Sequence, residues 1–105
     1  AANPYLVLAV CLEAGLDGIR NQITPPDAVT ENVFEMQLQQ RAKLGIESLP
    51  GDLEQAVEEL EKDDYIKNVL GGHITEKYLE AKKAEWADYR AQVTAWEIEK
   101  YLYKI

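Results

Sequence analysis

The single histidine, His73, is the first place in this 105-residue sequence where chemistry could be expected. Glu76 follows three residues later, so a helix would place both side chains on one face as a His-x-x-Glu metal half-site. One histidine with one carboxylate is half a site at best. Capping or packing is the more ordinary role for a histidine that follows Gly71 and Gly72. We therefore predict no metal-binding and no catalytic residue in this chain, and keep a small metalloenzyme built on His73 as an alternative.

A run of carboxylates could also be considered as a cation site; it comprises Glu58, Glu59, Glu61, Asp63 and Asp64. The spacing and the central glycine of an EF-hand loop are absent, so we expect a solvated helix face. The glycines Gly15 and Gly18 lie inside a helical pattern. No strand precedes them, as a phosphate-binding loop would require.

Aromatic side chains gather toward the C-terminal end: Trp86, Tyr89, Trp96, Tyr101 and Tyr103. Tryptophan and tyrosine dominate protein interfaces, but the same residues at helical spacing also pack in cores, and both interpretations stay open. Near the end of the chain these side chains need cover, for which a neighbouring subunit is a natural source. The predicted oligomer contacts are Trp96, Tyr101, Leu102, Tyr103 and Ile105.

Helices and connectors must position these residues. Asn3 followed by Pro4 predicts a helix start, since Asn accepts from unpaired N–H groups and Pro presets φ. Capping and breaking residues then predict helices at about 4–20, 38–44, 53–63, 64–70 and 73–92, and a terminal helix that begins with the capping box Thr94-Ala95-Trp96-Glu97. No segment alternates as a strand would. We expect an all-α fold of about five helices with connectors and no sheet, in one domain over residues 1–105.

The first predicted helix is apolar on every side of its early turns, where it carries Leu6, Val7, Leu8, Val10 and Leu12. Such a helix must be surrounded by protein. The remaining residues are too few to cover it, and the chain has no initiator methionine. We therefore expect it to be a segment of a larger protein.

The charge and the cysteine content limit the partners and the compartment. Eleven basic against nineteen acidic residues give a net charge of −8, which argues against nucleic acid and anionic membranes as partners. The apolar run from Tyr5 to Leu12 is well short of the roughly 20 residues that span a bilayer. Cys11, the only cysteine, is expected to be a small buried side chain, and a reducing cytoplasm agrees with its single occurrence.

Several motifs in order resemble one family. They are Ala2-Asn3-Pro4-Tyr5-Leu6, Ala14-Gly15-Leu16-Asp17-Gly18-Ile19, Pro25-Pro26, Glu31-Asn32-Val33-Phe34-Glu35-Met36, Leu44-Gly45-Ile46, Leu49-Pro50-Gly51, Trp86-x-x-Tyr89-Arg90 and Val93-Thr94-x-Trp96-Glu97-x-x-x-Tyr101-Leu102. Together they resemble the C-terminal segment of the catalytic domain of bacterial type I glutamine synthetase.

The resemblance implies an ATP-dependent ligase that joins ammonia to glutamate to give glutamine, and that works as a two-ring dodecamer with Mg or Mn. The family's metal ligands and nucleotide contacts lie before the Asn-Pro-Tyr motif, so none can be assigned to this sequence. The segment's implied role is to pack behind the active-site sheet and mediate ring-ring contacts, and we expect it to be inactive alone. The alternative is a self-standing acidic helical module that binds another protein.

One departure from the family concerns regulation. In one branch a tyrosine accepts AMP, and the matching position here is Phe34, which has no hydroxyl group to modify. The resemblance therefore implies a parent enzyme controlled by feedback inhibition and regulatory proteins.

Overall fold

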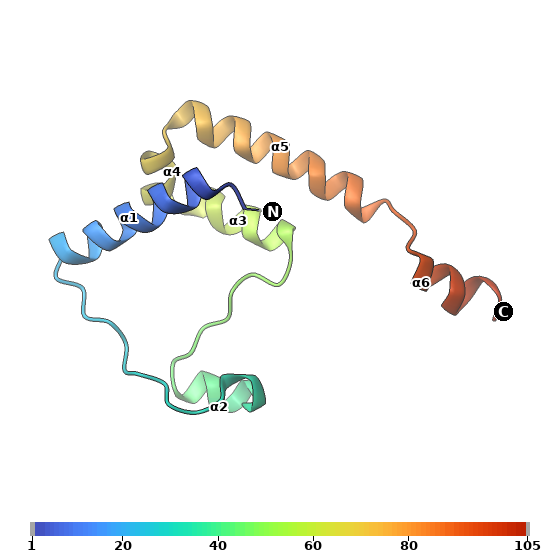
Figure 1. The fold of residues 1–105 in the computed structure, drawn as a ribbon, viewed down its shortest axis with the longest axis horizontal. Helices are drawn as coiled ribbons and strands as arrows, with labels where there is room; N and C mark the ends of the chain where they lie inside the picture. Colours follow the sequence, from blue (N-terminus) through green and yellow to red (C-terminus); the bar gives the residue numbers. More distant parts are fainter. Residues whose placement is uncertain (1, 105) are drawn as a thin grey trace. The chain divides into compact units, whose positions relative to one another are not determined.

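The structure, a computed structural model, describes residues 2–104, and every regular element among them is helical. In chain order the elements are α1 (Pro4–Arg20), η1 (Val33–Glu35), α2 (Leu38–Lys43), α3 (Leu53–Lys62), α4 (Asp64–Leu70), α5 (Gly72–Arg90), α6 (Ala95–Glu97) and η2 (Ile98–Leu102) (Figure 1). The predicted all-α fold without a sheet is confirmed for this part of the chain. Internal contacts divide the chain into two compact units, Ala1–Gly51 and Asp52–Ile105. The single domain over residues 1–105 stays a prediction.

Helix α1 begins as the sequence predicts. The side-chain oxygen of Asn3 accepts hydrogen bonds from the backbone N–H groups of Tyr5 (3.0 Å) and Leu6 (3.3 Å), and Pro4 occupies the first helical position. These bonds satisfy donors that have no partner inside the helix. The predicted span of 4–20 is confirmed.

The ends of α1 and α2 share one geometry. After α1, Gln22 donates to the carbonyl of Ile19 (3.2 Å) and Ile23 to that of Gly18 (2.9 Å). After α2, the equivalent bonds join Gly45 to Ala42 and Ile46 to Arg41, at 3.2 Å and 2.9 Å. This is the Schellman arrangement, which needs a left-handed residue just beyond the helix. Gln22 (φ 50°) and Gly45 (φ 69°) supply it.

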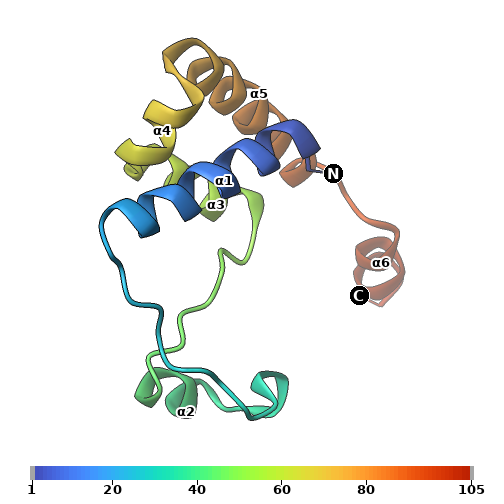
Figure 2. The same cartoon turned by 60° about the vertical axis from the view of Figure 1, so that its left-hand side comes forward.

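An extended connector joins α1 to the short turn η1 in the first unit (Figure 2). Pro25 and Pro26 lie in it and disfavour both helix and sheet, as predicted. Turn η1 and helix α2 follow, and Met36 between them is one of the two most buried apolar side chains of residues 2–104, at 7% exposed.

Helices α3, α4 and α5 pack against one another in the second unit. Asp52 and Asp63 begin α3 and α4, because their carboxylates accept from the N–H groups of Gln55 (2.8 Å) and Ile66 (3.0 Å). Gly71, at φ 83°, ends α4. The sequence predicted that Gly72 would also belong to this break. It is instead the first residue of α5, because the positive φ of Gly71 alone reverses the chain.

The apolar first turns of α1 are largely uncovered. No residue of α1 is buried, and Tyr5, Leu8 and Leu12 are 83%, 71% and 64% exposed. That downstream residues do not enclose this helix stays a prediction. Cys11 was predicted to be buried, and this was wrong: it lies on the same uncovered helix and is exposed. No helix among residues 2–104 is long and apolar enough to cross a membrane.

Candidate interaction surfaces

The residues that could have formed a metal or acid-base site do not converge. His73 and Glu76 lie in the first two turns of α5 and are exposed. Within residues 2–104, no group of three or more His, Cys, Asp or Glu side chains is placed to hold a metal ion.

The carboxylate run of α3 and α4 is a solvated surface, as predicted, and some of its members pair with lysines. Its members are all exposed: Glu58, Glu59, Glu61, Asp63 and Asp64. Glu59 pairs with Lys62 at 3.3 Å and Asp64 with Lys67 at 3.2 Å, both one helical turn apart. Glu61 pairs with Lys83, which ties α3 to α5. Exposed ion pairs of this kind add little stability and mainly keep the surface hydrated.

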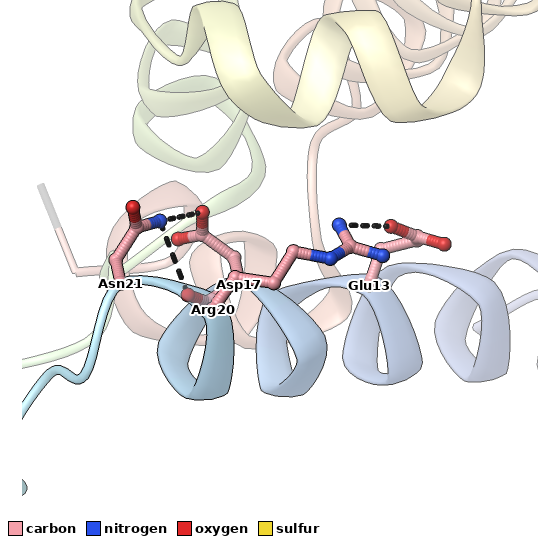
Figure 3. A network of polar contacts seen from close by, with 4 residues as sticks. All are labelled: Glu13, Asp17, Arg20 and Asn21. Atoms are coloured by element: carbon pink, nitrogen blue, oxygen red, sulfur yellow. Dashed lines mark hydrogen bonds and ion pairs between the residues drawn. The ribbon is translucent and has the colours of Figure 1, made fainter.

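The second half of α1 carries a polar stripe that its first turns lack (Figure 3). Arg20 pairs with Glu13 at 3.8 Å, two turns along the helix. The amide of Asn21 donates to the carboxylate (2.7 Å) and the backbone carbonyl (3.1 Å) of Asp17. These four side chains lie along one side of the helix, so α1 is apolar all round only near its start.

The C-terminal helical segment, α6 with η2, begins with a complete capping box. Glu97 N–H donates to the Thr94 hydroxyl oxygen at 3.2 Å, and Thr94 N–H donates to the Glu97 carboxylate at 2.7 Å. The Thr94 hydroxyl also donates to that carboxylate, at 2.9 Å. The backbone hydrogen bond from Thr94, and then its hydroxyl, hold the pKa of Glu97 below its usual value of 4.5. Local bonds therefore define where this segment starts.

The aromatic side chains of this segment contact one another but remain largely uncovered. The rings of Trp96 and Tyr101 meet edge to face, with centroids 5.7 Å apart, and the ammonium of Lys100 lies 6.0 Å from the Trp96 ring. Trp96, Tyr101 and Tyr103 are 60%, 60% and 80% exposed, and Leu102 is 59% exposed. They lie on one short helical segment and form the surface predicted for oligomer contacts. Ile105, also predicted to contribute, lies outside the described residues.

The other aromatic pair belongs to α5. The rings of Trp86 and Tyr89 lie 5.8 Å apart at an angle of 33°. Trp86 is half-buried, and its indole N–H is buried without an acceptor among residues 2–104. Tyr89 remains 65% exposed. The sequence left open whether these aromatic side chains pack in a core or lie on a surface. Trp86 is therefore partly packed, whereas the aromatic side chains of the C-terminal segment lie on an exposed surface.

Phe34 occupies the centre of η1 and is 96% exposed. The Asn32 side chain accepts from Phe34 N–H at 3.1 Å, and Met36 N–H donates to the Val33 carbonyl at 3.2 Å. The sequence pointed to the missing hydroxyl of Phe34 but not to the exposure of its ring. The available signal was an acidic, polar stretch with no basic residue between Arg20 and Arg41.

Residues 2–104 thus form a helical chain that carries exposed apolar side chains on α1 and on the C-terminal segment. The chain matches the family described as "Glutamine synthetase, catalytic domain" over residues 1–101, and it belongs to this family. This confirms the resemblance noted in the sequence.

Individual relatives agree. The chain is 52% identical to a glutamine synthetase of Thermotoga maritima over 103 residues, which cover 98% of this chain and 24% of that protein. It is 50% identical to one of Methanocaldococcus jannaschii over 100 residues, covering 95% and 22%, and 47% identical to one of Clostridium saccharobutylicum over 104 residues, covering 99% and 24%. The chain thus spans about a quarter of the length of these relatives.

Proposed function

We propose that this chain works as part of a cytoplasmic glutamine synthetase, a ligase that uses ATP to join ammonia to glutamate. The observation that carries the proposal is the family match over residues 1–101. ATP and Mg or Mn would bind to other parts of the enzyme. In this proposal the chain contributes packing and assembly surfaces, and alone it is inactive.

Helix α1, in this proposal, packs behind the active-site sheet of the complete subunit. Its exposed apolar side chains support this role, because Tyr5, Leu8 and Leu12 present a large area that favours removal from water. Burial of each such side chain contributes roughly 1.5–3 kcal/mol. A sheet supplied by the rest of the subunit would provide the cover.

The C-terminal segment mediates contact between the two rings of a dodecamer in this proposal. Exposed Trp96, Tyr101, Leu102 and Tyr103 support it, since aromatic anchors dominate the energetics of interfaces. The capping box at Thr94 and Glu97 supports it as well, because a helix defined by its own bonds loses less conformational freedom on docking.

The test combines assembly with activity in the full-length protein. Trp96→Ala with Tyr101→Ala should convert the dodecamer to smaller species in analytical ultracentrifugation and lower glutamine formation in parallel. Tyr89→Ala is the matched control, because Tyr89 is similarly exposed but belongs to α5. An unchanged dodecamer in the double variant would contradict the ring-contact role. Absence of ATP-dependent glutamine formation by the wild-type protein would contradict the ligase itself.

A further inference from the structure

No further inference is drawn: the strongest candidate, the groove at the α4–α5 junction lined by Asp64, Lys67, Asn68, Gly72, Thr75 and Glu76, offers a ligand only the N-terminal end of α5, because the buried Thr75 hydroxyl already donates to the Lys67 carbonyl at 3.2 Å and nothing else in the groove points to a ligand.

Discussion

Gln22 and Gly45 occupy equivalent left-handed positions after two helices, although only one of them is a glycine. The left-handed backbone conformation costs a residue with a Cβ roughly 1–2 kcal/mol, whereas glycine adopts it freely. Around Gly45 an added Cβ would meet no atom within 4 Å. Any effect of a side chain there must therefore come from the backbone conformation, at φ 69°.

A matched pair of substitutions tests this residue-scale argument. Gly45→Ala should destabilise the protein by about 1 kcal/mol, because alanine is strained at positive φ. Gln22→Gly should stabilise it by about 0.5–1 kcal/mol, since the relief of the same strain at φ 50° is only partly offset by the greater conformational freedom of glycine in the unfolded chain. Denaturant unfolding of the full-length protein measures both. Effects of the same sign would contradict the argument.

The side chain of Phe34 leads to a prediction about covalent modification. A phenyl ring has no hydroxyl to accept AMP, although the ring is fully accessible on η1. Incubation of the full-length protein with an adenylyltransferase and ATP should therefore leave its intact mass unchanged, and Phe34→Tyr is the variant in which an adduct could form. An AMP adduct mapped to residues 1–105 of the wild type would contradict the prediction.

At the level of secondary structure, short-range hydrogen bonds define where each helix begins. Asn3, Asp52, Asp63 and Thr94 each accept from an N–H group two or three residues ahead, and each stands immediately before the first residue of a helix. Their bonds act inside a single turn. Helix positions were therefore accessible from the sequence, to within two residues for the five longer helices.

The Thr94–Glu97 capping box should make the C-terminal segment sensitive to acid. The pKa of Glu97 is lowered in the folded state, so its contribution to helix stability is complete above the unfolded value near 4.5 and is lost as the pH falls through the lower folded value. The expected result is a drop in amide exchange protection at Glu97 and Ile98 in that acidic range.

Glu97→Gln is the control for this pH dependence, because glutamine can still reach the Thr94 N–H but does not titrate. Protection in this variant should be lower at neutral pH and should not change through the acidic range. A wild-type protein whose protection factors at Glu97 and Ile98 are the same at neutral and acidic pH would show that the carboxylate bond does not hold the segment.

At the scale of the whole molecule, residues 2–104 have few buried apolar side chains and many exposed ones. Only Met36 and Val57 are buried apolar side chains among residues 2–104, while Tyr5, Leu8 and Leu12 on α1 lie open to water. A chain of this kind gains free energy by associating. A self-standing interaction module would instead cover its core and remain monomeric.

Residues 1–105 expressed alone should therefore self-associate in sedimentation velocity and bind a hydrophobic dye. Leu8→Gln with Leu12→Gln should reduce both signals severalfold, because it removes apolar area from the uncovered face of α1. Glu47→Gln, also exposed in the first unit, serves as the control for surface substitution. A monomeric wild-type chain without dye binding would favour the self-standing module.

The sequence itself determined the helix bounds and the absence of strands among residues 2–104, because capping groups, prolines and glycines act on their nearest neighbours. It also determined the membership of the family. The burial of individual side chains was not determined in this way. Cys11 and Trp86 both lie in apolar helical patterns, yet Cys11 is exposed and Trp86 is half-buried. Thr75 is polar, yet it is only 7% exposed and donates to the Lys67 carbonyl across the α4–α5 junction. Only the tertiary structure decided this, since the burial of a side chain depends on which distant segments reach it and not on the turn that carries it.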